Sequence, residues 1–242
     1  MGIRSALAGL IDTCADDKSM PTALVTGGNR GIGLATVRQL AASGIEVWLG
    51  ARDPAAARAC ADALAAEGFA GVHPVTIDVA DTASIAACAR RIEATGGHID
   101  ILINNAGLYL QGSVLDAPEA CFAQAMAVNA FGALWCARAF MPGMLARGWG
   151  RIVNLASGYG CFSTGLDGPA PYSLSKAALN AITLMLARAS SGDVKVNAVD
   201  PGWVRTRMGG PQAPRAVEDA AADVVWAATL PADGPHGCLL RR

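Results

Sequence analysis

The sequence predicts an α/β fold: a Rossmann-like, doubly wound parallel sheet of about seven strands with helices on both faces. Short runs of apolar, often β-branched residues alternate with longer Ala-rich stretches of helical length. The short runs are apolar at nearly every position, as expected of strands that are buried on both faces. Glycines and polar residues follow most of these runs, at the edge where such sheets bind ligands.

The alternation gives one element after another along the chain. We expect strands near residues 22–26, 45–50, 72–76, 99–103, 151–155 and 194–199, and a short closing strand near 237–241. We expect helices near residues 31–43, 54–67, 82–95, 118–146, 171–190 and 216–229. No linker or repeat interrupts this pattern, so residues 21–242 are predicted to form a single domain. Residues 1–20 are predicted to be a flexible N-terminal tail, and Met20 is a candidate natural start.

The composition of the chain argues against nucleic acid, a membrane or a metal ion as its binding partner. Hydrophobic residues make up 52% of the 242 positions and charged residues 16%, which favours a globular protein. A net charge of −1 gives no basic surface for nucleic acid. No run of 18 or more apolar residues occurs, so no membrane span is expected. The seven cysteines form no CxxC pair and the three histidines are scattered, so we expect no metal site and a reduced, cytoplasmic protein.

The stretch TGGNRGIG (residues 26–33) links the first expected strand to the first expected helix. Glycines at such a turn let the backbone approach a pyrophosphate, and the helix N-terminus stabilises its charge. The alternative is an ordinary Gly-rich turn, although its place after the first strand favours cofactor binding. The loop lacks the terminal Lys-Ser/Thr of a P-loop, which disfavours a triphosphate.

The end of the second strand bears on the choice of dinucleotide. NAD-binding folds place an acidic residue here for the ribose 2′-hydroxyl, but this chain has Ala51 followed by Arg52. Arg30 in the glycine loop is a second guanidinium, and two guanidiniums suit a 2′-phosphate. Asp53 precedes Pro54 and is expected to cap the next helix. The sequence therefore favours NADP(H) over NAD(H), unless both arginines are merely solvated.

Four polar residues are candidates for the chemistry. Tyr172 and Lys176 lie four residues apart, and therefore on one helix face, where the lysine charge is expected to lower the tyrosine pKa. Ser157, after the fifth strand, is placed to bind a carbonyl oxygen. Asn129, inside a long helix, is placed to hold a proton-relay water. The alternatives are a surface Tyr–Lys pair and a buried structural asparagine.

Several motifs in order resemble the short-chain dehydrogenase/reductase family over residues 21 to 241. They are TGGNRGIG (26–33), DV (78–79), NNAG (104–107), VNAFG around Asn129, NLASG around Ser157, YSLSK (172–176) and DPGWVRT (200–206). The combination of NRGIG and ARD is similar to NADPH-dependent carbonyl reductases of the family.

The resemblance implies a dinucleotide-binding catalytic domain that interconverts a small carbonyl compound and its alcohol. It implies a catalytic set of Asn129, Ser157, Tyr172 and Lys176, with Tyr172 as acid/base and Lys176 also on the nicotinamide ribose. The implied cofactor-binding residues are Gly27, Asn29, Arg30, Gly31, Ile32, Gly33, Arg52, Asp78, Val79, Asn105, Ala106, Gly107, Tyr172, Lys176, Pro201, Gly202, Val204 and Thr206. A homodimer or homotetramer, built through the two long helices near 118–146 and 171–190, is also implied.

Some features depart from the family pattern. The spacing between Ser157 and Tyr172 is longer than usual, and the segment after Thr206 is short, which predicts an unusual wall and an open pocket. The N-terminal tail precedes the family's usual start, and the chain ends just after the last strand. Candidate wall residues are mostly apolar and suggest a hydrophobic carbonyl substrate: Leu108, Tyr109, Tyr159, Phe162, Trp203 and Met208.

Three other functions remain as alternatives. A serine hydrolase would use Ser157, Asp200 and His236, but Leu155 replaces the first glycine of the G-x-S-x-G elbow. A non-catalytic NADP-binding sensor would have the same fold. An NAD-dependent alcohol dehydrogenase would differ only in the cofactor.

Overall fold

The computed structural model describes residues 20–242, so the expected tail lies outside the described residues except for Met20. Seven strands form one sheet in the order β3-β2-β1-β4-β5-β6-β7, and every neighbouring pair is parallel. The predicted doubly wound parallel sheet is confirmed.

The strands and helices lie close to their expected positions. The strands are β1 (Thr22–Thr26), β2 (Glu46–Ala51), β3 (Val72–Thr76), β4 (Ile101–Asn104), β5 (Trp149–Leu155), β6 (Asp193–Val199) and β7 (Leu239–Leu240). The α-helices are α2 (Gly31–Ala42), α3 (Pro54–Ala66), α4 (Thr82–Glu93), α5 (Glu119–Ala125), α6 (Gly132–Arg147), α7 (Ala170–Ala189) and α8 (Val217–Ala228). A π-helical turn, η1 (Met126–Phe131), joins α5 to α6, and two 3₁₀ turns, η2 (Gly158–Gly160) and η3 (Phe162–Thr164), precede α7.

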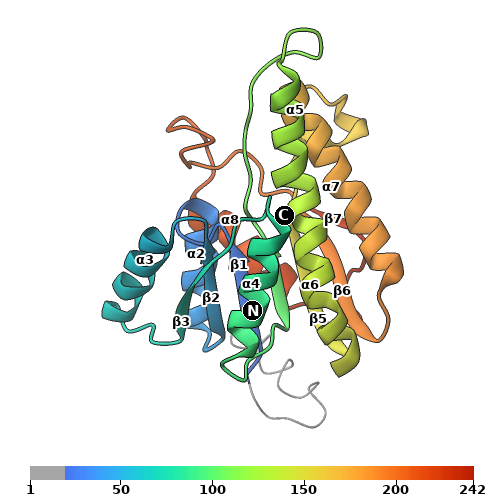
Figure 1. Ribbon diagram of the computed structural model, residues 1–242. Coiled ribbons are helices and arrows are strands. Elements are labelled where there is room, and N and C mark those ends of the chain that lie inside the picture. The colour runs from blue at the N-terminus through green and yellow to red at the C-terminus, as the bar shows by residue number, and fades with distance from the viewer. Residues whose placement is uncertain (1–19) are drawn as a thin grey trace.

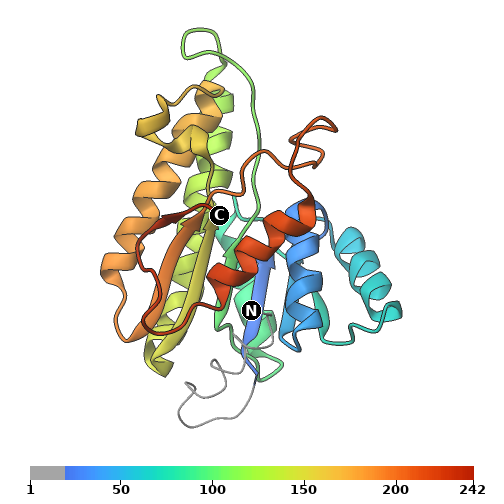
Figure 2. The ribbon, with the colours of Figure 1, turned by 180° about the vertical axis from the view of Figure 1, so that it is seen from behind.

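Helices cover both faces of the sheet. Helices α4, α6 and α7 lie in front of the sheet in Figure 1, and α8, α2 and α3 cover the opposite face in Figure 2. Each face has its own buried apolar cluster. All five residues of β1 are buried, because the strand is central and covered on both sides.

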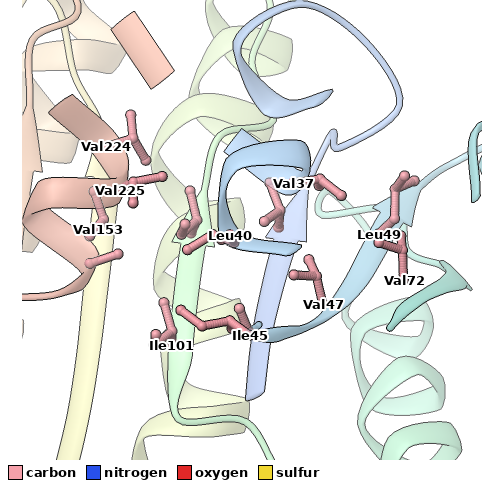
Figure 3. Close-up of a cluster of buried hydrophobic side chains, with 14 of the residues drawn as sticks. Val37, Leu40, Ile45, Val47, Leu49, Val72, Ile101, Val153, Val224 and Val225 are labelled. Carbon is pink, nitrogen blue, oxygen red and sulfur yellow. The ribbon is translucent and has the colours of Figure 1, made fainter. Parts of the chain in front are cut away.

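The cluster beneath α2 and α8 shows what holds these layers together. Val37 and Leu40 of α2 pack toward Leu49 of β2 and Val224 of α8, and none of these side chains is accessible to solvent (Figure 3). Full burial of such an aliphatic side chain stabilises the fold by about 1.5–3 kcal/mol. This packing keeps α2, whose N-terminus faces the site, fixed on the sheet.

The strand order reverses between β1 and β4, and the loops that follow these two strands are tied together there. Oγ1 of Thr26 accepts hydrogen bonds from the backbone N–H groups of Asn105 and Ala106, both at 3.1 Å. The Asn105 side chain donates to the carbonyl oxygens of Thr26 at 2.8 Å and Gly27 at 3.0 Å. Ligands of doubly wound sheets bind in the crevice at this reversal.

The helix expected over residues 118–146 differs from a regular α-helix. Its middle turn, η1, is π-helical and carries Asn129, and Pro142 lies inside α6. Within the described residues, the continuous stretch Glu119–Arg147 is long and apolar enough to span a membrane by length and composition alone. A core helix passes the same test, and α6 packs against β4, β5 and α4.

Candidate active site

A cavity of about 510 Å³ opens at the carboxyl ends of the strands, beside the reversal between β1 and β4. It draws its walls from the loops after β1, β2, β3, β4, β5 and β6, and from α7. The lining residues foreseen from the sequence are Gly27, Asn29, Arg30, Gly31, Ile32, Arg52, Asp78, Val79, Asn105, Ala106, Gly107, Leu108, Tyr109, Tyr172, Lys176, Pro201, Thr206 and Met208.

The glycine loop leaves backbone open to the cavity. Gly27 and Gly31 have φ angles of +64° and +52°, which glycine adopts without strain. A Cβ on Gly27 would lie 3.1 Å from Cα of Ala106, so a side chain would crowd the crevice. The loop leads directly into the N-terminus of α2, whose free N–H groups favour an anion. This cradle fits the pyrophosphate of a dinucleotide.

The far end of the cavity is basic. Arg30 and Arg52 line it, while the Asp53 carboxylate accepts hydrogen bonds from the backbone N–H groups of Ala55 and Ala56, which confirms its expected role as a helix cap. Burial, together with the charges of Arg207 and Arg52, lowers the pKa of Arg30. Asp78 lines the same region, and its carboxylate accepts a hydrogen bond from the backbone N–H of Ala80.

Tyr172 and Lys176 face the cavity from the first turns of α7, and both are buried, at 7% and 5% exposure. Nζ of Lys176 donates a hydrogen bond to the carbonyl oxygen of Leu155 at 2.6 Å, and lies 5.6 Å from the ring centre of Tyr172. Burial lowers the pKa of Lys176 to about 8, with the Asp200 carboxylate acting in the opposite direction.

The expected lowering of the tyrosine pKa by Lys176 is not seen in the protein alone. Burial raises the pKa of Tyr172 to about 12, and a side-chain hydrogen bond with Ser157 acts in the opposite direction. The nearby Asp200 carboxylate raises that pKa further. The physical reason is that desolvation of the phenolate outweighs the favourable contacts when the ring is almost fully enclosed.

Ser157 lies two residues after the end of β5, at the start of the turn η2. The backbone of Ser157 is extended. Its Oγ accepts a hydrogen bond from the backbone N–H of Tyr159 and thereby caps the turn η2. The long segment that follows packs tightly on α7: a Cβ on Gly160 would lie 2.6 Å from the backbone carbon of Lys176. The unusual spacing between Ser157 and Tyr172 is thus taken up by two short 3₁₀ turns.

Asn129 holds the loop after β4 rather than leaving its side chain free for a water. The backbone N–H of Leu108 donates to its Oδ1 at 2.7 Å, and its Nδ2 donates to the Leu108 carbonyl at 2.8 Å and to Ser175 Oγ at 2.9 Å. Both amide hydrogens are therefore in use.

The sequence and the fold are matched by known proteins. The model of the family described as short chain dehydrogenase matches residues 21–216. This chain belongs to the short-chain dehydrogenase family. It is therefore an oxidoreductase of a family that uses a nicotinamide cofactor and acts on small molecules.

The alignments with two curated relatives extend over most of this dehydrogenase. It is 39% identical over 187 residues to galactitol 2-dehydrogenase (L-tagatose-forming) of Cereibacter sphaeroides, which is 77% of this chain and 72% of the relative. It is 37% identical over 189 residues to acetoacetyl-CoA reductase of Allochromatium vinosum, covering 77% of this chain and 76% of the relative.

Solved structures of other members have the same architecture. A gluconate 5-dehydrogenase from Burkholderia cenocepacia, in complex with NADP and tartrate, superposes with a TM-score of 0.83 at 28% identity, over 92% of this chain and 93% of that one. Salutaridine reductase from Papaver somniferum gives a TM-score of 0.78 at 26% identity, over 90% and 99% of the two chains.

Five expected site residues of this dehydrogenase do not line the cavity: Gly33, Asn129, Ser157, Gly202 and Val204. Gly33 lies behind the glycine loop, where a Cβ would be 2.3 Å from the carbonyl oxygen of Gly27. Val204 is buried, and its carbonyl oxygen accepts hydrogen bonds from Thr206. Gly33, Asn129 and Val204 are buried and support the walls from behind. Ser157 is only partly buried and hydrogen-bonds Tyr172, which does line the cavity.

Of the six residues expected to form the substrate wall, three line the cavity and three do not. Leu108, Tyr109 and Met208 line the cavity, whereas Phe162 and Trp203 are 84% and 58% exposed and do not. All three tyrosines of the chain come together: the rings of Tyr109 and Tyr159 lie 4.7 and 6.4 Å from that of Tyr172, both edge-on.

Several residues that line the cavity were not expected from the sequence: Ala51, Ile77, Leu110, Val128, Leu155, Ala156 and Arg207. Most are small or apolar and carry no signal in a sequence. Arg207 is the exception, because it directly follows the expected contact Thr206 and is basic, like the other arginines of this cavity.

The hydrolase alternative is contradicted. His236 hydrogen-bonds Ser190, the carbonyl oxygen of Ala187 and the backbone N–H of Val196, so both ring nitrogens are used away from Ser157. In the described part of the chain, no three or more His, Cys, Asp or Glu side chains are grouped to hold a metal ion.

Proposed function

We propose that this dehydrogenase interconverts a carbonyl compound and its alcohol with NADP(H), using Tyr172 as the acid/base. The observation that carries the proposal is that Tyr172 and Lys176 lie buried in the same cavity as the glycine loop. A reduced nicotinamide supplies the hydride when it is bound. A phenol whose pKa is raised to about 12 stays protonated at neutral pH, which suits proton donation to a developing alkoxide.

Each neighbour of Tyr172 has a role in this proposal. The hydrogen bond with Ser157 orients the phenol, and the serine hydroxyl is placed to bind the carbonyl oxygen. Lys176 is held by the Leu155 carbonyl through one of its three N–H donors, which leaves two donors for the cofactor ribose. Asn129 positions the loop after β4 at the cavity wall.

The preference for NADP(H) rests on Arg30 and Arg52. Both line the cavity, and no acidic side chain follows β2 other than Asp53, whose carboxylate caps α3. A guanidinium pair binds a 2′-phosphate through charge-assisted hydrogen bonds. A related dehydrogenase of the same fold was solved in complex with NADP, which supports this choice.

The proposed substrate class rests on the apolar residues that line the cavity. Leu108, Tyr109, Leu110, Val128 and Met208 are among the larger apolar and aromatic side chains of the lining residues, and they favour a hydrophobic ketone or aldehyde.

Assembly as a homodimer or homotetramer is part of the proposal. Leu174, Leu184 and Met185 of α7, and Phe131 of η1, are exposed. A second copy of the chain would bury these side chains, and light scattering in solution would give the number of copies.

A panel of ketones and aldehydes, assayed by the absorbance of NADPH and of NADH, tests the function. We expect turnover with NADPH, and a loss of about 10²–10⁴-fold in kcat for Tyr172→Phe. NADPH binding and circular dichroism of the variant would show that the fold is intact. Tight NADPH binding without turnover on any carbonyl would favour a sensor, and an active Tyr172→Phe variant would overturn the catalytic assignment.

A further inference from the structure

The segment 203–215 forms a short lid whose root lies on the glycine loop. An isolated bridge pairs Val204 with Arg215, and the Trp203 indole donates to the carbonyl oxygen of Gly209 at 2.8 Å. At the root, Cγ2 of Thr206 would lie 3.5 Å from a Cβ on Gly31. Figures 1 and 2 both show this segment projecting above α2, from the end of β6 to the start of α8. The lid is thus a compact unit in contact with the cofactor loop.

Two neighbouring arginines of the lid are used differently. Arg205 donates to the carbonyl oxygens of Ala213 at 3.1 Å and Pro214 at 2.7 Å, which closes the lid on itself. Arg207 lines the cavity instead, and makes no hydrogen bond or ion pair with any residue of the described chain. Its charge is therefore available to a ligand.

Arg207 meets two other unpaired arginines at the cavity. Arg30 comes from the glycine loop and Arg52 from the end of β2, and neither has an ion-pair partner among residues 20–242. The charge of Arg207 lowers the pKa of Arg30 more than the charge of Arg52 does. Like charges held together in this way repel one another, and an anion with several negative charges would relieve the repulsion.

We propose that Arg207 is a cofactor-binding residue carried by the lid: together with Arg30 it binds a phosphate of NADP(H) and draws the lid onto the cavity. The inference rests on the proposed use of a phosphorylated dinucleotide. Because Met208 lines the same cavity, cofactor binding through Arg207 also fixes part of the substrate wall.

Binding measurements on Arg207→Gln test the contact, with Arg90→Gln as the matched control. Arg90 is an exposed arginine in the last turn of α4 and does not line the cavity. We expect the Kd for NADPH to rise about tenfold or more in Arg207→Gln and to stay unchanged in Arg90→Gln. Titration with 2′,5′-ADP and with ADP identifies the phosphate. A loss for both indicates the 5′-phosphate that they share, a loss for ADP alone indicates the second phosphate of the pyrophosphate, and a loss for 2′,5′-ADP alone indicates the 2′-phosphate.

A second measurement follows the lid itself. Chymotrypsin should cleave after the exposed Trp203, and saturating NADPH should protect this bond in the wild-type protein and in Arg90→Gln. Protection should be lost in Arg207→Gln even when NADPH is saturating. Equal protection, with equal Kd values, would overturn the inference about the lid. Neither readout needs turnover, so that result differs from a failure of the proposed function, in which the wild-type protein would not bind NADPH or would not turn over.

Discussion

Asn129 and Leu108 are joined by two reciprocal hydrogen bonds: the Leu108 N–H donates to Asn129 Oδ1 at 2.7 Å, and Asn129 Nδ2 donates to the Leu108 carbonyl at 2.8 Å. The amide thus replaces the partner strand that Leu108 lacks beyond β4. The side chain is only 2% exposed and also donates to Ser175 on α7. It therefore connects the π-helical turn, the cavity wall and the helix of Tyr172.

Replacing this amide should cost both stability and activity. Asn129→Ala leaves the backbone groups of Leu108 without partners, which should lower the free energy of unfolding by about 2–4 kcal/mol. The freed loop should also raise KM for the carbonyl compound, because Leu108 lines the cavity. Urea denaturation and steady-state kinetics would measure the two effects. Gln39→Ala, which removes one exposed hydrogen bond to the Glu218 carbonyl, should change neither by much.

The basic end of the cavity predicts a selective defect. Arg52→Ala should weaken binding of NADPH by about tenfold or more, because it removes a charge-assisted hydrogen bond to the 2′-phosphate. Binding of NADH, which lacks that phosphate, should change little. Fluorescence titration with both cofactors would measure the ratio of the two Kd values. An equal change for NADPH and NADH would contradict the assignment of Arg52 to the 2′-phosphate.

Gly33 should tolerate no side chain. A Cβ there would lie 2.3 Å from the Gly27 carbonyl oxygen and 2.4 Å from Nδ2 of Asn105, so Gly33→Ala must displace the glycine loop. We expect a loss of cofactor binding and a decrease in stability of about 1–3 kcal/mol. Gly71→Ala is the control, because its nearest neighbour would be 3.9 Å away. A Gly33→Ala variant that binds NADPH normally would show that the loop is not rigid.

The strands and helices of this fold could be predicted because each has a signal in its own short stretch of sequence. Buried strands such as β1 and β4 are mostly apolar runs, and the glycines after β1 are required by close approach of the backbone. The π-helical turn around Asn129 has no such local signal, and its hydrogen bonds with Leu108 join residues 21 positions apart. The same is true of the cluster of tyrosines, since Tyr109 and Tyr159 come from loops that only the sheet brings together.

The electrostatics of the site were harder to predict than its residues. The spacing of Tyr172 and Lys176 places them on one helix face, but the pKa of a phenol depends on how deeply it is enclosed. In the structure, burial dominates for both side chains, and the pKa values of Tyr172 and Lys176 move in opposite directions, toward the neutral forms.

The burial of Lys176 gives a pH dependence with a definite sign. Its pKa is lowered from 10.5 to about 8, so between these values the unfolded chain binds the proton that the folded protein has lost. The stability of the wild-type protein relative to a variant without this amine therefore rises as pH increases from about 8 to about 10.5. Below pH 8 the buried ammonium is a constant cost, because both states are protonated.

Lys176→Met isolates this contribution. We compare the free energy of unfolding of the variant with that of the wild type at each pH. The value of variant minus wild type should be larger at pH 7 than at pH 10 by about 2–3 kcal/mol, because one pKa unit corresponds to about 1.4 kcal/mol. All other titrating groups are common to the two proteins, so their contributions cancel when urea denaturation is compared at the same pH. The lost hydrogen bond to the Leu155 carbonyl shifts both values equally and leaves the pH dependence unchanged. Parallel stability curves between pH 7 and pH 10 would mean that Lys176 keeps its ordinary pKa in the folded protein, and that water reaches it in the cavity.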